Sequence, residues 1–133
     1  MAPLGEEPTF RVVLVDSDED VRALLEVILA FAPRFQVVGA AGDGHEGVGL
    51  VRRLAPDVVA MNLELPDLDA LDAISLIRQD APDTKIVVFS SVPDPITLVE
   101  VVRRGADAYV DKENAWSELI PTMSSVCESL VTG

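Results

Sequence analysis

Basic residues are scarce in this chain. Its 10 Lys and Arg stand against 23 Asp and Glu, which gives a formal charge of −13 at pH 7 and an isoelectric point near 4.2. A surface this acidic repels the phosphates of nucleic acids and the headgroups of anionic lipids. We therefore expect the domain to bind no nucleic acid and no membrane surface.

Cysteine and long apolar runs are almost absent as well. Cys127 is the only cysteine, so no internal disulfide can form, and such usage is typical of a reducing compartment. The longest apolar run, residues 23–33, is interrupted by Glu26 and is too short to span a bilayer. The first nine residues are polar and contain proline, unlike a secretory signal peptide. These absences predict a cytoplasmic protein.

The length and the apolar content set the size of the fold. A chain of 133 residues has room for one domain with one sizeable core, and 49 % of its residues are hydrophobic. We expect a flexible N-terminal tail over residues 1–9 and a single domain over residues 10–133.

Two kinds of apolar segment alternate along the chain. Short β-branched runs predict buried strands over residues 11–15, 35–39, 57–63, 85–89 and 106–110. Longer stretches with helical spacing predict helices over residues 20–31, 46–54, 68–79, 96–104 and 116–131. Five strands that alternate with five helices predict a doubly wound α/β fold, in which helices cover both faces of a parallel sheet.

The last predicted helix contains Pro121, which would remove a backbone hydrogen bond. We expect this helix to begin near Ser117 or Glu118, or to bend at Pro121. Cys127 falls on its apolar stripe and is expected to be buried. Trp116, beside the start of the helix, is either a local packing residue or an exposed contact.

A glycine motif in the second connection predicts no nucleotide site. Gly42, Gly44 and Gly47 have the G-x-G-x-x-G spacing of a dinucleotide-binding turn, but they follow the second strand rather than the first. The chain is also too short for two mononucleotide-binding halves. His45 has no cysteine or second histidine nearby, so neither a metal site nor a catalytic triad is predicted there.

Polar side chains follow the predicted strands where each of them ends. Asp16 and Ser17 follow the first strand, Asn62 ends the third, Ser90 follows the fourth and Lys112 follows the fifth. In a sheet with strand order 2-1-3-4-5 these ends converge at one edge. We therefore expect an acid, an amide, a hydroxyl and an ammonium group to meet above the sheet.

These residues resemble the receiver domain of bacterial response regulators, the CheY-like superfamily. The similarity lies in Val-Leu-Val-Asp ending at Asp16, Pro-Asp-Val-Val before Asn62, Pro66 beyond it, and Gly-Ala-Asp-Ala-Tyr-Val-Asp-Lys ending at Lys112. It extends over residues 11–131 and is strongest to receivers that precede a helix-turn-helix output domain. The resemblance implies a three-layer α/β/α flavodoxin-like fold and a role in two-component phosphorelay signalling.

In that family an acidic pair and a third-strand aspartate hold Mg²⁺, and this aspartate accepts a phosphoryl group from a histidine kinase. A serine or threonine and a lysine contact the phosphoryl oxygens. The resemblance assigns the first acid to Asp16 and the lysine to Lys112. It assigns the switch positions to Ser90 and Tyr109, although we expect Tyr109 to be a part-buried packing residue with a hydrated hydroxyl.

The chain departs from the family at two positions. Ser17 stands where the second acid is expected, and Asn62 stands at the phosphoacceptor position. A carboxamide has no anionic oxygen to attack phosphorus, and Asp16 alone is a weak ligand set for Mg²⁺. Glu64 offers only partial compensation, so we expect weak or absent Mg²⁺ binding and no cofactor. With these acids gone, Asp16 and Lys112 are expected to pair directly.

The sequence thus predicts a pseudo-receiver, a protein–protein interaction module that works without phosphorylation and has no enzymatic activity. Its partner, or a second copy, would bind the fourth helix, fifth strand and fifth helix, or the first and fifth helices. One alternative is a phosphorylatable receiver that uses a substitute acid such as Glu64. Another is the N-terminal receiver of a longer DNA-binding response regulator.

Overall fold

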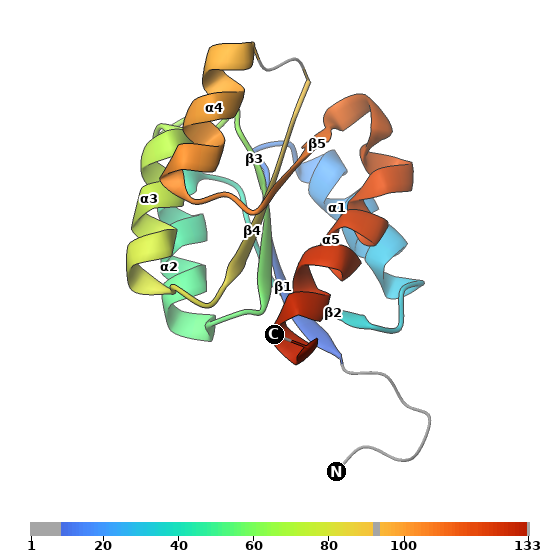
Figure 1. Ribbon diagram of the computed structural model, residues 1–133. Coiled ribbons are helices and arrows are strands. Elements are labelled where there is room, and N and C mark those ends of the chain that lie inside the picture. The colour runs from blue at the N-terminus through green and yellow to red at the C-terminus, as the bar shows by residue number, and fades with distance from the viewer. Residues whose placement is uncertain (1–8, 92–93, 133) are drawn as a thin grey trace.

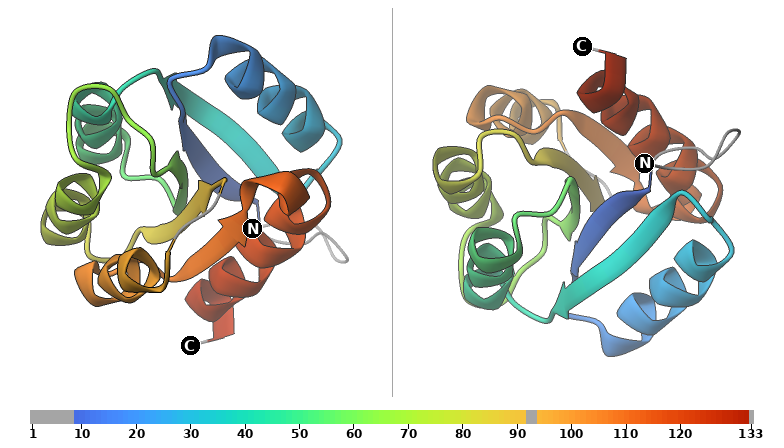
Figure 2. Two further views of the ribbon diagram at one scale, coloured as in Figure 1. Left: turned by 90° about the horizontal axis from the view of Figure 1, so that it is seen from above. Right: turned by 90° about the horizontal axis from the view of Figure 1, so that it is seen from below.

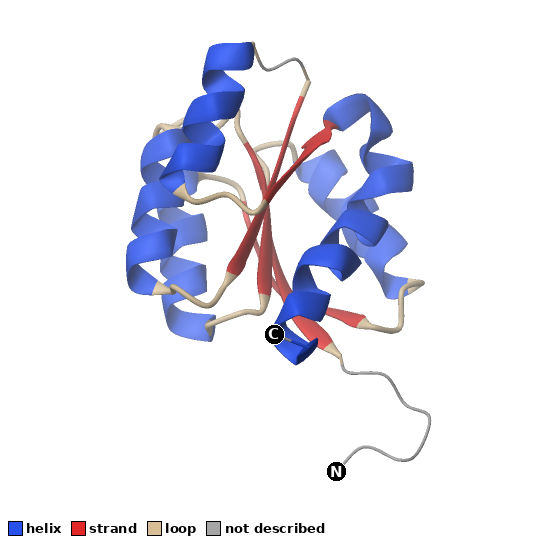
Figure 3. Cartoon of the chain, in the orientation of Figure 1, coloured by secondary structure: helices blue, strands red, loops and turns tan. Residues whose placement is uncertain are grey.

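The protein folds as one five-stranded sheet between two helical layers. The computed structural model describes residues 9–91 and 94–132, and the side chains of Trp116 and residues 129–132 are outside that description. Helices and strands alternate along the chain (Figure 3), and all strand pairs are parallel in the order β2-β1-β3-β4-β5. This order confirms the doubly wound, flavodoxin-like fold.

The strands form where β-branched and other apolar residues run continuously, because both faces of the sheet are covered. In β3 every residue is buried, and in β4 every residue except the first is buried. The strands are β1 (Phe10–Val15), β2 (Phe35–Ala41), β3 (Val58–Asn62), β4 (Lys85–Ser90) and β5 (Ala108–Asp111).

The helices divide between the two faces of the sheet. They are α1 (Glu19–Ala30), α2 (Gly44–Leu54), α3 (Ala70–Asp80), α4 (Pro95–Arg104) and α5 (Ala115–Thr132), with a short 3₁₀ turn η1 (Lys112–Asn114) before α5. Figure 1 shows α1 and α5 on one face and α2, α3 and α4 on the other, and both views in Figure 2 show the same division. None of the helices in the described part of the chain is long and apolar enough to cross a membrane.

Each face of the sheet has its own core. Leu14, Leu25 and Phe89 belong to the core under α1 and α5, together with Met123 and Cys127. The other core, under α2, α3 and α4, is built around residues such as Met61, Ile74 and Val101. Alternate residues of each strand enter opposite cores, which explains why the strands have no polar face.

Several element boundaries differ from the sequence prediction, and the start of α5 is one of them. It begins at Ala115, not near Ser117 or Glu118, and Pro121 lies inside it. The prediction of a late start is wrong. Met123 and Cys127, beyond Pro121, are fully buried, so their packing against the sheet offsets the hydrogen bond that proline removes.

The loop before α2 also differs from the prediction. β2 extends to Ala41 and α2 starts at Gly44, where Asp43 caps it by accepting a hydrogen bond from the amide of Glu46 at 2.7 Å. A Cβ at Gly44 would lie 2.8 Å from Cβ of Leu68. Close packing of α2 therefore requires glycine here. The tail predicted over residues 1–9 lies outside the described residues except for Thr9.

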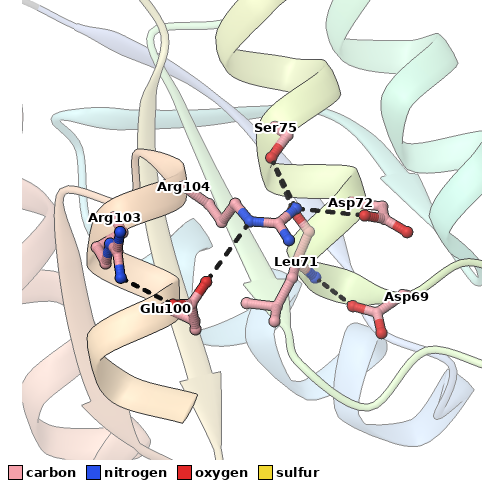
Figure 4. Close-up of polar contacts among 7 residues, drawn as sticks. All are labelled: Asp69, Leu71, Asp72, Ser75, Glu100, Arg103 and Arg104. Atoms are coloured by element: carbon pink, nitrogen blue, oxygen red, sulfur yellow. Dashed lines mark hydrogen bonds and ion pairs between the residues drawn. The ribbon is translucent and has the colours of Figure 1, made fainter. Parts of the chain in front are cut away.

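An arginine joins α4 to α3. Arg104 Nη1 donates to Oγ of Ser75 at 3.1 Å and to the carbonyl oxygen of Leu71 at 3.4 Å, and it lies 3.3 Å from the carboxylate of Asp72. Its Nε lies 3.8 Å from Glu100, one turn earlier on α4. Figure 4 shows the guanidinium between the two helices. We call these contacts the Arg104 bridge.

Candidate functional site

The parallel strands bring the predicted polar residues to one edge of the sheet. Asp16 follows β1, Asn62 ends β3, Ser90 ends β4, and Lys112 follows β5. Asp16 is 1 % exposed and Asn62 is 2 % exposed, so the centre of the group is buried. We call Asp16, Asn62, Ser90, Tyr109 and Lys112 the strand-end cluster.

A buried hydrogen bond joins the two central residues. Asn62 Nδ2 donates to Oδ2 of Asp16 at 3.0 Å. The other carboxylate oxygen of Asp16 accepts from the backbone amide of Asp18 at 2.8 Å, and Oδ1 of Asn62 accepts from the amide of Glu64 at 2.9 Å. Both ends of each side chain therefore have partners within the protein.

Lys112 does not pair with Asp16 as the sequence predicted. It lies in η1 and is half-buried, and no salt bridge joins it to Asp16 within the described residues. The expected Asp16–Lys112 pair is wrong. The amide of Asn62 already meets Asp16 from the adjacent strand β3, whereas Lys112 follows β5, at the far edge of the sheet.

The switch positions contact each other through a main-chain oxygen. The Tyr109 hydroxyl donates to the carbonyl oxygen of Ser90 at 3.0 Å, and the ring packs against the core under α2, α3 and α4. The packing was predicted, but the hydroxyl has a protein partner instead of relying on water alone. Burial, together with the nearby Asp111 carboxylate, raises the pKa of Tyr109. Ser90 Oγ is 3.5 Å from Oε1 of Glu64, a long contact.

These residues do not fit a magnesium site. Mg²⁺ requires octahedral oxygen ligands and normally one or two carboxylates. Ser17 is exposed and carries no charge, Asn62 turns its NH₂ group toward Asp16, and both oxygens of Asp16 accept hydrogen bonds. Within residues 9–91 and 94–132 no three His, Cys, Asp or Glu side chains are grouped to hold a metal ion.

Sequence reasoning missed Arg22. Its Nη1 donates to the carbonyl oxygen of Asp16 at 2.6 Å, so a guanidinium ties α1 to the end of β1. A Cβ at Gly42 would approach Arg22 Nη1 at 3.2 Å. The spacing from Asp16 to Arg22, across a helix start, gives no signal that a sequence pattern could identify.

Sequence reasoning also missed Asp67, on the loop between β3 and α3. Its carboxylate accepts from the amides of Gly44 at 2.7 Å and His45 at 3.0 Å, and it contacts the His45 ring. Partial burial opposes ionisation, but these donors outweigh it and hold the pKa of Asp67 well below its usual range. Asp67 therefore fastens the loop to the start of α2.

Cys127 lies far from this edge, in an apolar environment that disfavours the reactive thiolate. It is fully buried among apolar residues, as predicted, and burial raises the pKa of its thiol to about 12. A thiol with so high a pKa is a poor nucleophile. The side chain of Trp116 is outside the described part of the chain, so the structure does not choose between its two predicted roles.

Comparison with known proteins defines the class. Residues 12–124 match the family model of the response regulator receiver domain, and the chain belongs to this family. The chain is 37 % identical over 109 residues to the transcriptional regulatory protein LiaR of Bacillus subtilis, covering 82 % of this chain and 52 % of LiaR. It spans about half the length of LiaR and of other curated relatives that it matches.

Two further relatives agree with the fold. The chain is 30 % identical to the chemotaxis protein CheY of Thermotoga maritima over 116 residues, which are 87 % of this chain and 96 % of CheY. A LuxR-family two-component response regulator from Aurantimonas sp. SI85-9A1 has a crystal structure with a TM-score of 0.85 and 29 % identity, with 91 % of this chain and 86 % of that one covered. The chain is thus a receiver domain of the two-component type.

Proposed function

We propose that this receiver domain accepts no phosphoryl group and acts as a phosphorylation-independent protein–protein interaction module. The observation that carries the proposal is the buried hydrogen bond from Asn62 to Asp16. In a phosphorylatable receiver two acids would meet at these positions and would need a cation between them. Here the neutral amide of Asn62 donates to a single acid, Asp16, so the pair needs no cation.

The chemistry of the remaining groups supports the same reading. Phosphoryl transfer to a carboxylate requires an anionic oxygen and a hard cation to neutralise the incoming charge. Asn62 supplies no anionic oxygen, and Ser17 supplies no carboxylate for a cation. We therefore propose that the domain catalyses no phosphorylation of its own and binds Mg²⁺ weakly or not at all.

Glu64 is the basis of the second candidate function. Its carboxylate lies within 3.5 Å of the Ser90 hydroxyl, at the edge where a phosphoryl group would bind. A receiver that used Glu64 as a substitute acceptor would carry a phosphoryl group there. Glu64 is exposed and extends from the loop beyond β3, so the carboxylate lacks the fixed position of a strand-end aspartate.

The exposed side of α4 supports an interaction role. Ile96, Val99 and Val102 follow one another at three-residue spacing and are 78 %, 55 % and 64 % exposed. The Arg104 bridge (Figure 4) fastens the last turn of this helix to α3. The helix that carries the apolar stripe is therefore fixed in place. We propose that a protein partner or a second copy binds the surface of α4, β5 and α5, or that of α1 and α5.

The charge supports the remaining parts of the proposal. With a formal charge of −13, this domain is a poor ligand for DNA or membranes, so any role in transcription would pass through protein contacts. We further propose that the domain covers residues 10–133 and that the protein lies in the cytoplasm, since usage of a single cysteine is typical of a reducing compartment.

The test is incubation with acetyl phosphate and Mg²⁺, followed by the mass of the intact protein. The proposal predicts no added phosphoryl group. One phosphoryl group per chain would overturn it, and loss of that group in Glu64→Gln would identify the substitute acceptor.

A further inference from the structure

The outer side of α1 carries an apolar stripe that the fold does not use. Leu25 and Leu29 face the sheet and are buried, whereas Leu24, Val27 and Phe31 are exposed. The spacing of three and four residues places these three on one side of the helix. Phe31, at its C-terminal end, is 84 % exposed, so the stripe ends in a large apolar side chain that the fold leaves in solvent.

The stripe leads into a pocket between α5 and the segment that follows α1. This pocket has a volume of about 380 Å³ and is lined by Phe31, Ala32, Pro33, Arg34, Phe35, Ile120 and Ser124. The two helices lie side by side on the same face of the sheet (Figure 2). An exposed aromatic ring beside a pocket is a typical anchor of a protein interface.

The charges around this surface are mostly negative. α1 and α5 together carry five carboxylates and one guanidinium, and the segment Ala115–Thr132 has no Lys or Arg. That guanidinium belongs to Arg22, which donates to the carbonyl oxygen of Asp16. Arg34, at the pocket, pairs with Glu128 at 3.2 Å. The carboxylates are Glu19, Asp20, Glu26, Glu118 and Glu128.

The opposite layer differs in charge. α2, α3 and α4 carry four carboxylates and five guanidinium groups, so their net charge is slightly positive, although the whole chain is strongly acidic. The acidic character of the helices is therefore concentrated on the α1 and α5 face. This concentration supplies electrostatic selectivity to an otherwise apolar contact.

We propose that the α1–α5 face binds an amphipathic helix whose apolar side is flanked by Lys or Arg. The apolar side would cover Leu24, Val27 and Phe31, and one large side chain would fill the pocket beside Phe31. The flanking cations would meet Asp20, which continues the stripe one turn before Leu24, and the acids of α5. A second copy fits this face poorly, because the same carboxylates would face each other.

The inference rests on the proposed function only in that the domain acts by binding a protein. It names a partner chemistry for one of the two proposed surfaces and requires nothing of the strand-end cluster. A phosphorylated chain would overturn the proposed function and leave this inference standing. Failure of the peptide experiment described below would overturn this inference and leave the proposed function standing.

The experiment uses the full chain and a synthetic helical peptide with leucine on one side and lysine on its flanks. Titration calorimetry gives the affinity, and ¹H–¹⁵N spectra identify the amides that shift. We expect saturable binding with shifts confined to α1, α5 and the segment that joins α1 to β2. A peptide with glutamate for lysine, and one with alanine for leucine, should each bind at least about tenfold more weakly, since both charge and apolar area are required.

Variants of the protein locate the contact. Phe31→Ala removes the anchor at a position exposed enough to leave the fold intact, and we expect about a tenfold or larger loss of affinity. Leu76→Ala on α3 is the control, an exposed apolar residue of the opposite helical layer whose replacement should leave the affinity unchanged. Equal binding of all three peptides, loss in Leu76→Ala but not in Phe31→Ala, or self-association of the protein through Phe31 would overturn the proposal.

Discussion

Aspartate and asparagine at position 62 differ by one group, but they act in opposite ways on Asp16. An aspartate would present an acceptor to an acceptor across 3 Å, and both carboxylates would be buried. Asparagine presents a donor, and its oxygen accepts from the amide of Glu64. The pair therefore needs no proton or cation to be stable.

Truncation of Asn62 tests this arrangement through stability. Asn62→Ala leaves the buried Asp16 carboxylate without its side-chain donor and opens a small cavity. We expect the free energy of unfolding to fall by about 1–3 kcal/mol, measured by urea denaturation. Ser17→Ala, at an exposed neighbouring position, is the control and should change it by less than about 0.5 kcal/mol. An unchanged stability in Asn62→Ala would mean that the hydrogen bond contributes little.

Restoring the family residues tests the account of the chemistry. Asn62→Asp supplies a nucleophile but places a second buried carboxylate beside Asp16, and Ser17 still supplies no charge for Mg²⁺. We expect little or no phosphorylation by acetyl phosphate in Asn62→Asp, and clear phosphorylation in Asn62→Asp with Ser17→Asp, measured by intact mass. Full phosphorylation of the single variant would show that one carboxylate is sufficient.

At the scale of helices and strands, the clearest effect on stability is expected from Asp67, which fastens a loop to the start of α2. It accepts hydrogen bonds from the first residues of α2, and its pKa is lowered in the folded chain. A lowered pKa adds stability above the unfolded value, near pH 4, and this stability is lost as the pH falls below it. We expect Asp67→Asn to melt at a lower temperature than the wild type at pH 7, with the difference shrinking below pH 4.

Thermal denaturation from pH 7 to pH 3 measures this effect. Asp83→Asn, at an exposed aspartate on the loop after α3, controls for the loss of one negative charge and should show no such dependence. A constant difference between Asp67→Asn and wild type across this range would contradict the assigned role of the carboxylate.

The sequence predicts the strands and helices well because apolar residues are spaced differently in the two kinds of element. Short β-branched apolar runs predicted all five strands, and helical spacing predicted all five helices, in the observed order. The start of α5 was mispredicted because Pro121 is a strong local signal that burial of Met123 and Cys127 overrides. The start of α2 was predicted two residues too late because Gly44, which follows the cap Asp43, is a poor helix former.

The candidate site was predictable in composition but not in its contacts. The topology brings the strand ends together, so Asp16, Asn62 and Ser90 could be grouped from the sequence. Which of the possible partners meets Asp16 depends on side-chain directions that no pattern encodes, and Lys112 was assigned to it wrongly. The guanidinium of Arg22 donates to the main-chain carbonyl oxygen of Asp16, a contact that no sequence pattern reveals either.

At the scale of the whole molecule, the two helical layers differ in their exposed residues. The α4 stripe lies on the layer with slightly positive helices, and the α1 stripe lies on the acidic layer. Two apolar surfaces of different charge allow two different kinds of partner. Neither stripe includes a residue of the strand-end cluster, so the binding that we propose does not require phosphorylation there.

Charge placed on α4 tests whether that surface is used. Val99 and Val102 are exposed, so Val99→Glu and Val102→Glu should change the free energy of unfolding by less than about 0.5 kcal/mol. We expect them to weaken binding of a partner captured by crosslinking by about 2 kcal/mol where they meet an interface hot spot. Lys112→Ala should leave that affinity unchanged. Loss of binding in Lys112→Ala alone would place the partner at the strand-end cluster.

The central claim is that the Asp16–Asn62 pair leaves no place for a metal ion and a phosphoryl group. The most direct measurement is a titration of the ¹⁵N-labelled protein with beryllofluoride and Mg²⁺, followed through the amides after β1, β3 and β4. The double variant Asn62→Asp with Ser17→Asp is the positive control. We expect saturable shifts of these amides in the double variant and none in the wild type. Saturable shifts in the wild type, abolished by Asp16→Ala, would contradict it.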